Sequence, residues 1–208
     1  MNWAAKAISG LIRIKSIPGQ TDLSLRRIFT SGWQSDWKDY LEQTLLKVSP
    51  KAQVKKIDYG KNPKDYQKAP IKMVYRYEIP NYAVVTEHHI LVKPLIMNNL
   101  FNNIESYRYI TNLPHRKYAF KDRCSRLVEL NETMTIPTGY KLVGNERIDD
   151  MTSNAADFKA SLMQEDNQLI LKEHLALKKR VYEASDWKGF NMAVNKFKDY
   201  GKFIILNK

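Results

Sequence analysis

Apolar and polar residues alternate along most of the chain, and this alternation predicts β-strands. In residues 71–79, IKMVYRYEI, apolar or aromatic side chains at the odd positions alternate with Lys72, Arg76 and Glu78, and only Val74 breaks the pattern. Because successive side chains of a strand point to opposite faces, we expect a half-buried antiparallel strand here. Similar runs predict strands at residues 10–17, 23–30, 52–59, 83–92, 126–137, 140–148, 156–164, 168–182 and 202–207.

Turn residues join some of these runs directly. Pro18-Gly19-Gln20 separates the first two runs, so residues 10–17 and 23–30 are expected to pair as a hairpin. A second turn is expected around Glu165-Asp166-Asn167, between the runs at 156–164 and 168–182.

The string SDWK occurs twice, and each copy opens a segment with helical periodicity. Apolar residues follow at positions 37, 41, 45 and 48 in one segment, and at 187, 190, 194 and 197 in the other. Spacings of three and four place these side chains in one stripe along a helix. The sequence therefore predicts two amphipathic helices, over about residues 35–48 and 186–199.

The residue types in SDWK suit the start of a helix. Ser35 and Ser185 are expected to cap their helices by accepting a free backbone N–H, and the aspartates that follow complement the positive end of the helix dipole. Trp37 and Trp187 are expected to anchor the first turn in the core. Since the match does not continue beyond about six positions, we interpret the strings as two helix starts and not as a repeat.

These elements predict a mostly β, antiparallel, β-sandwich-like fold with two amphipathic helices. With 43% hydrophobic residues, the chain has enough apolar material for a core, and we expect residues 1–208 to form one compact unit. Gly60, Pro63 and Pro70 mark an internal boundary at residues 60–70. It divides a β-β-α-β segment at 1–62 from a sandwich with a C-terminal helix and last strand at 70–208.

Apolar runs in the chain are short. No stretch approaches the roughly 20 apolar residues that span a bilayer, so no membrane-spanning segment is expected. Lys6 and Arg13 interrupt the first 15 residues, and we therefore expect no signal peptide in this chain.

Residues for catalysis, metal or cofactor binding are sparse. Cys124 is the only cysteine, and although Arg123 beside it favours a thiolate, we expect a small buried or edge residue of a strand and not a nucleophile. His88 and His89 are adjacent in a predicted strand, so they point to opposite faces and do not share a metal. The acidic residues at 146, 149 and 150 are expected in a solvated loop, with no carboxyl of raised pKa. We therefore expect no enzymatic activity, no metal and no cofactor.

The formal net charge of +12 favours anionic partners, and the basic residues are densest at 114–126, PHRKYAFKDRCSR. Basic side chains with interleaved aromatic rings are typical of surfaces that hold nucleic acid. The alternative function is thus a polyanion-binding or nucleic-acid-binding module. No recognised nucleic-acid-binding motif is present, so nucleic acid is not the expected partner. The candidate binding residues are Arg116, Lys117, Lys121, Arg123 and Arg126.

Three segments together resemble a known family. They lie at residues 69–83, 126–144 and 156–206, in the order strand, Ile-Pro-x-Gly-Tyr, strand, long hairpin, Tyr, amphipathic helix and last strand. This order resembles the β-rich domain of unknown function that follows a transglutaminase-like, papain-type core in exported proteins of Bacteroidetes. The resemblance covers most of the chain from Gly10 onward.

The resemblance implies a function and a setting. In such proteins the catalytic residues lie in the upstream core, and Cys124 matches no part of a transglutaminase nucleophile motif. It implies a non-catalytic accessory or interaction domain that supports a transglutaminase-like partner domain on the same longer polypeptide. A periplasmic or cell-envelope location is also implied.

Overall fold

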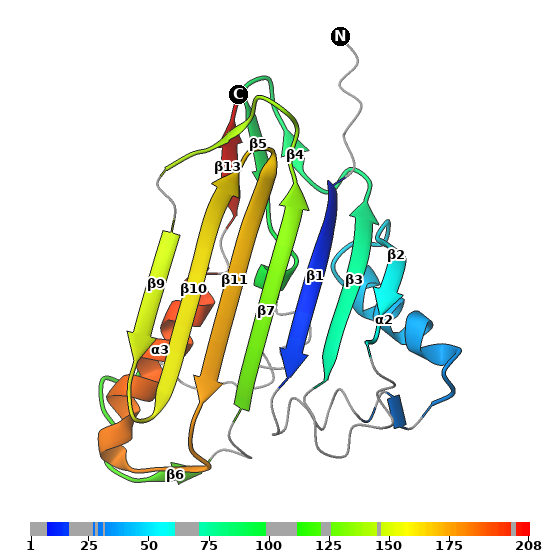
Figure 1. The fold of residues 1–208 in the computed structure, drawn as a ribbon. Helices are drawn as coiled ribbons and strands as arrows, with labels where there is room; N and C mark the ends of the chain where they lie inside the picture. The colour runs from blue at the N-terminus through cyan, green and yellow to red at the C-terminus, as the bar shows by residue number, and fades with distance from the viewer. Residues whose placement is uncertain are drawn as a thin grey trace.

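A seven-stranded antiparallel sheet forms the centre of the protein (Figure 1). The computed structural model of the chain describes residues 8–16, 27, 29–30, 32–60, 71–98, 112–121, 126–144, 147–200 and 203–208. From edge to edge, the sheet contains β2 (Gln53–Asp58), β3 (Lys72–Ile79), β1 (Ile8–Ser16), β7 (Arg126–Thr135), β11 (Gln168–Leu177), β10 (Ala156–Glu165) and β9 (Arg147–Thr152).

One face of this sheet is covered by a second layer (Figure 1). The helix α2 (Asp36–Leu46) lies behind β2 and β3, and the helix α3 (Trp187–Tyr200) lies behind β9, β10 and β11. A smaller sheet packs against the same face, where its Val85, Ile90 and Val92 line a cavity together with Ile8 and Met134. Its strands are β4 (Val84–Val85), β5 (His89–Val92), β13 (Ile204–Asn207) and β8 (Lys141–Leu142). The expectation of a mostly β, antiparallel, sandwich-like fold with two helices is confirmed.

Short elements complete the covered side. The 3-10 helix η2 (Ile96–Asn98) packs against β7, and η4 (Ala184–Asp186) leads directly into α3. The two-residue strands β6 (Phe120–Lys121) and β12 (Val181–Tyr182) pair with each other at one end of the large sheet. Within the described residues, no helix is both long and apolar enough to cross a bilayer.

Period-two burial explains which side of the large sheet is covered. In β3, Met73, Tyr75 and Tyr77 are buried, whereas Lys72 and Arg76 are exposed, as the sequence predicts. The same alternation runs through β10 and β11. A side chain's position along its strand therefore decides whether it joins the core or the opposite face.

Both SDWK strings begin helices, as expected. Trp37 and Trp187 are each only 1% exposed. Trp37 meets the ring of Phe29 edge to face, with ring centroids 5.0 Å apart. Trp187 lies against Phe190, and its indole N–H donates to the backbone oxygen of Leu113 at 2.9 Å. Each tryptophan therefore fixes the first turn of its helix in the core.

The predicted serine caps are wrong, because Ser35 makes no side-chain capping bond and the N-cap of η4 is Glu183 instead of Ser185. Ser35 already has helical backbone angles, and its hydroxyl donates to Asp36 at 2.9 Å. A capping residue needs extended angles to accept an N–H of the first turn. Ser185 lies inside η4, while the carboxylate of Asp186 accepts the backbone N–H of Glu183 at 2.9 Å.

The predicted hairpin of residues 10–17 and 23–30 is also wrong. Both edges of β1 are occupied, by β3 on one side and β7 on the other. Arg27, Phe29 and Thr30 are helical, whereas residues 17–26 with the predicted turn lie outside the described residues. Alternation over a short segment does not distinguish a strand from one turn of a helix.

Three long runs divide into shorter strands. The run at 83–92 is a hairpin of β4 and β5, closed where the N–H of Thr86 donates to His89 at 2.8 Å. The run at 140–148 contains β8 of the small sheet and the start of β9 of the large one, with Gly144 between them at a positive φ of 91°. The run at 168–182 contains β11 and β12. Period-two patterning continues through such turns, so it does not reveal them.

The predicted boundary at 60–70 falls almost entirely outside the described residues. The strands on either side of it, β2 and β3, are hydrogen-bonded neighbours in one sheet. A β-bulge between Val54 and Lys56 interrupts their register at this edge of the sheet.

The three tryptophans near the helices allow a matched test of the core. We expect Trp37→Ala and Trp187→Ala each to lower the free energy of unfolding by about 3 to 5 kcal/mol, because each removes a large buried side chain. Trp33, which is 80% exposed, is the control, and Trp33→Ala is expected to change stability by less than about 0.5 kcal/mol. Urea denaturation followed by circular dichroism measures all three. Equal effects at Trp33 and Trp187 would contradict the anchor role.

Candidate functional site

The predicted polyanion site is only partly on the surface. The guanidinium of Arg116 is half-buried and lies 4.5 Å from the ring centroids of both Phe120 and Trp187. Lys117 and Lys121 are exposed, and the Lys117 ammonium lies 5.6 Å from the ring of Tyr118. Arg123 and the side chain of Arg126 lie outside what the structure describes.

The aromatic rings of this stretch have different roles. Phe120 stacks on Tyr182 at 4.9 Å and belongs to the cluster around the first turn of α3. Tyr118, by contrast, is 72% exposed. Arg116 therefore stabilises the packing of the first turn of α3. This role depends on its contact with Trp187, which the local sequence did not reveal.

The other candidate residues are dispersed. His88 lies in the turn before β5, so the expectation that it shares a strand with His89 is wrong, and both side chains are exposed. Cys124 lies outside the described residues. In the part of the chain that the structure describes, no group of three or more metal-ligating side chains occurs.

The acidic residues at 149 and 150 lie in β9, and the expectation of a loop is wrong for them. Asp149 accepts from Lys196 of α3 at 2.6 Å, and Asp150 lies 3.3 Å from Lys159 of β10. These carboxylates are therefore neutralised by lysines. Glu146 lies outside the described residues, whereas Asp166 does form the expected β10–β11 turn, with a φ of 50°.

Two buried glutamates were missed by the sequence analysis. Glu132 of β7 is 0% exposed and Glu173 of β11 is 5% exposed. Glu132 occupies a core position between Leu130 and Met134, and Glu173 likewise interrupts a row of buried leucines. An acidic residue at the apolar phase of an alternating strand was the signal that could have revealed both.

Glu132 connects three elements. Its carboxylate accepts the hydroxyl of Tyr77 from β3, the N–H of Leu95 at 3.2 Å and the N–H of Ile96 at 3.0 Å. Gly10 is the direct cross-strand partner of Tyr77, and a Cβ at Gly10 would lie 2.5 Å from that hydroxyl. Only glycine leaves room for the tyrosine to reach the glutamate.

Burial raises the pKa of both glutamates, but their hydrogen bonding differs. It raises the pKa of Glu132, but three hydrogen bonds oppose the rise and stabilise the anion. Burial also raises the pKa of Glu173 from 4.5 to about 8, and the negative charge of Glu132 adds to the shift. Glu173 therefore retains its proton at neutral pH. The pair serves the core, since three protein donors already bind the carboxylate oxygens of Glu132.

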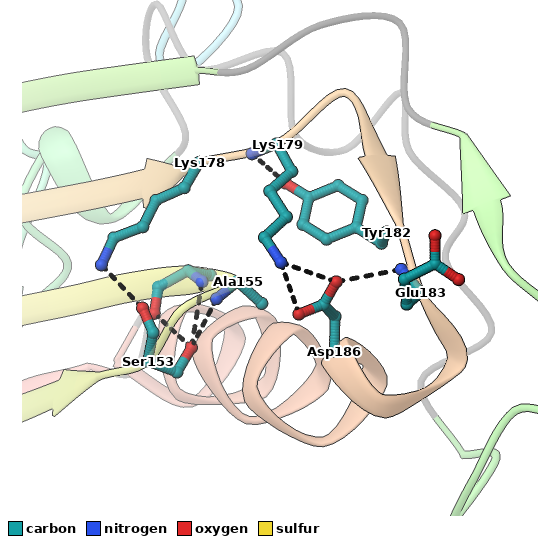
Figure 2. A network of polar contacts seen from close by, with 8 residues as sticks. Ser153, Ala155, Lys178, Lys179, Tyr182, Glu183 and Asp186 are labelled. Atoms are coloured by element: carbon teal, nitrogen blue, oxygen red, sulfur yellow. Dashed lines mark hydrogen bonds and ion pairs between the residues drawn. The ribbon is translucent and has the colours of Figure 1, made fainter.

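A polar network ties α3 to the sheet (Figure 2). The Lys179 ammonium donates to both carboxylate oxygens of Asp186, at 2.7 and 2.9 Å, and this bonding lowers the pKa of Asp186. The preceding Lys178 donates to the backbone oxygen of Ser153 at 2.6 Å. Two consecutive lysines after β11 thus hold the start of the helix and the β9–β10 turn.

The outer face of the large sheet, the one turned away from α2, α3 and the small sheet, carries the remaining candidate site (Figure 1). Among the described elements, none lies over it. A hollow of about 340 Å³ opens on this face across β7, β11, β10 and β9. Its polar side chains include Glu129, Asn131, Lys159, Ser161, Lys172 and His174.

Comparison with known protein families assigns the chain to one of them. Residues 88–206, more than half of the 208 residues, match the family described as a domain of unknown function with solved structure, DUF3858. The chain belongs to the DUF3858 family. No curated protein and no solved structure matches the chain.

The DUF3858 match contains most of the candidate site. It includes β7, β9, β10, β11 and α3, and with them both buried glutamates and the hollow. The strands β1, β2 and β3 precede the matched residues, although they complete the same sheet. The outer face therefore extends beyond the DUF3858 region.

Glu173 should make stability depend on pH. Between about pH 4.5 and about pH 8 the folded state keeps a proton that the unfolded state has lost, so stability falls as pH rises, by at most about 1.4 kcal/mol per pH unit. We expect Glu173→Gln to flatten this slope and to stabilise the protein most at the alkaline end. Urea denaturation across this range is the measurement. Glu129→Gln, on the outer face, is the control, and parallel slopes for wild type and Glu173→Gln would refute the assignment.

Arg116 should affect stability more than its lysine neighbour. We expect Arg116→Ala to lower the free energy of unfolding by about 1 to 2 kcal/mol, because the guanidinium lies between two rings in a partly desolvated place. Lys117→Ala is the matched control, with an expected change below about 0.5 kcal/mol. Thermal and urea unfolding measure both variants. Indistinguishable variants would mean that Arg116 has no structural role.

Proposed function

We propose that this DUF3858 protein is a non-catalytic accessory or interaction domain that supports a transglutaminase-like domain. The partner domain lies on the same longer polypeptide, in the periplasm or cell envelope. The partner and the location come from the resemblance of residues 69–83, 126–144 and 156–206 to the region that follows such cores.

The observation that carries the proposal is the outer face of the seven-stranded sheet. Its described residues present cations and half-buried apolar side chains, such as Leu11 and Ile170, over five neighbouring strands. Mixed apolar and basic surface of this extent is typical of a contact with another protein. The covered face, by contrast, is filled by the domain's own helices and small sheet.

The state of the acidic groups supports a role without catalysis. Glu132 is enclosed and bonded to three protein donors, and Glu173 lies beside it in the core. On the surface, Asp149 and Asp150 are each neutralised by a lysine. An acid or base that acts on a substrate has to reach the reacting atoms.

Polyanion binding through residues 114–126 is the second candidate. Lys117, Tyr118 and Lys121 are exposed, which favours it. Arg116 is engaged by two aromatic rings, which reduces the charge that the stretch offers to a phosphate or sulfate.

Binding to a transglutaminase-like domain tests the proposal. We expect the 208-residue chain to bind a purified transglutaminase-like domain from the same organism, with a Kd between about 1 µM and about 1 mM at physiological ionic strength. Domains on one polypeptide meet at roughly millimolar effective concentration, so a tighter contact is not needed. Isothermal titration calorimetry measures it.

The same titration with heparin oligosaccharide separates the two candidates. Heparin binding that falls steeply with salt, without any binding to the transglutaminase-like domain, would replace the proposal with the polyanion function. Lys117→Ala with Lys121→Ala would then weaken heparin binding.

A further inference from the structure

We infer that the outer face binds an acidic protein surface with an apolar centre, and that Arg13 and Lys172 are its main ionic contacts. The inference rests on the proposed function, because it specifies the chemistry of the partner surface. It concerns the outer face alone, and the 114–126 stretch has no part in it.

Strand register arranges the outer face in rows. Arg13, Asn131, Lys172 and Ser161 are direct cross-strand neighbours on β1, β7, β11 and β10. At a strand spacing of about 4.8 Å, this basic row extends about 14 Å across the sheet. Its ends are charged or polar, and its two cations are separated only by Asn131.

An apolar row runs beside the basic row. Leu11, Thr133, Ile170 and Met163 are again direct neighbours on the same four strands, and each lies two residues from the member of the basic row on its own strand. All four are half-buried, although no described element covers them. The two rows lie about 7 Å apart, so one partner surface can meet both.

Charge on the outer face is not balanced. Among the described acids of this face, Glu78, Glu129, Asp150 and Asp157 each lie within 3.3 Å of a lysine, whereas Asp58 on the edge strand β2 and Glu165 at the β10–β11 turn do not. Among the described residues, five cations of this face form no ion pair. They are Arg13, Lys56, Lys72, Arg76 and Lys172, and the partner must therefore supply carboxylates.

The hollow beside Lys172 gives such a carboxylate a place. Asn131 and Ser161 flank Lys172 with short side chains, and the space of about 340 Å³ opens there. Lys159 lines the same hollow. The hollow is large enough for one side chain of a partner. The apolar row beside it would lose contact with water when the partner binds.

Other occupants fit this face less well. Two copies of the chain placed face to face would bring unpaired cations together, which like-charge repulsion opposes. Binding of single-stranded nucleic acid relies on aromatic rings for stacking, and among the described residues of the outer face there is no phenylalanine, tyrosine or tryptophan. An acidic protein surface satisfies both the basic row and the apolar row.

A peptide probe and nuclear magnetic resonance test the inference. The probe is a synthetic peptide of about 12 residues with two central leucines flanked by aspartates and glutamates, a length that covers one face of this size when extended. We expect amide shifts in β1, β7, β10 and β11 of the 208-residue chain. Arg13→Glu with Lys172→Glu should weaken binding at least about tenfold, because attraction becomes repulsion.

The matched control makes the same change of charge on the covered side. Lys47 and Lys51 are exposed near the end of α2, and Lys47→Glu with Lys51→Glu should leave the affinity within about twofold of wild type, since neither faces the peptide. Folding of each variant is checked by its amide spectrum. Shifts elsewhere on the protein, or equal weakening by both double variants, would overturn the inference.

Two further probes distinguish protein docking from simple attraction to negative charge. A peptide with serine in place of both leucines and a single-stranded oligonucleotide should each bind more weakly than the leucine peptide. Equal binding of all three would overturn the inference. If the transglutaminase-like domain binds wild type and Arg13→Glu with Lys172→Glu equally, the inference fails and the proposed function stands; if that domain binds neither, the proposed function fails.

Discussion

The carboxylate of Glu132, buried in the covered face of the large sheet, is the constraint on which much of the architecture depends. A charged oxygen in the core is tolerated only where donors surround it, and here a tyrosine of β3 and two backbone N–H groups beside η2 supply them. One glutamate thus connects the centre of the sheet to the segment around η2. Gly10 leaves the space that Tyr77 needs to reach Glu132. The negative charge of Glu132 helps to keep Glu173 protonated.

The two faces of the sheet solve the problem of charge in opposite ways. On the covered face, acids are enclosed and stabilised by hydrogen bonds, and the lysines of α3 and of the residues after β11 neutralise the acids at its margin. On the outer face, cations outnumber acids and stay in water. Successive residues of a strand point to opposite faces, so the same strand contributes to both arrangements. In β11, Lys172 is exposed on the outer face and Glu173 is buried on the covered face.

The sequence predicted the elements whose signals are local. Alternation identified β3 and β10, and the SDWK strings identified both helices and their buried tryptophans. Where the structure depends on distant residues, sequence reasoning failed. The division of residues 140–148 between two sheets, the stacking of Arg116 on Trp187 and the bonding of Glu132 to η2 each require partners far along the chain. The serine caps failed for a local reason, because Ser35 already has helical backbone angles and Ser185 lies inside η4.

The bulge in β2 bears on how the molecule associates with others. An edge strand with free backbone groups is a template for another strand, and proteins block it with irregular register and charge. At one edge of the sheet, β2 has a register shift between Val54 and Lys56 and two consecutive lysines. At the other edge, β9 contains two consecutive aspartates. Sheet extension into fibrils or strand-swapped pairs is thereby discouraged at both margins, and association is directed to the broad surface between them.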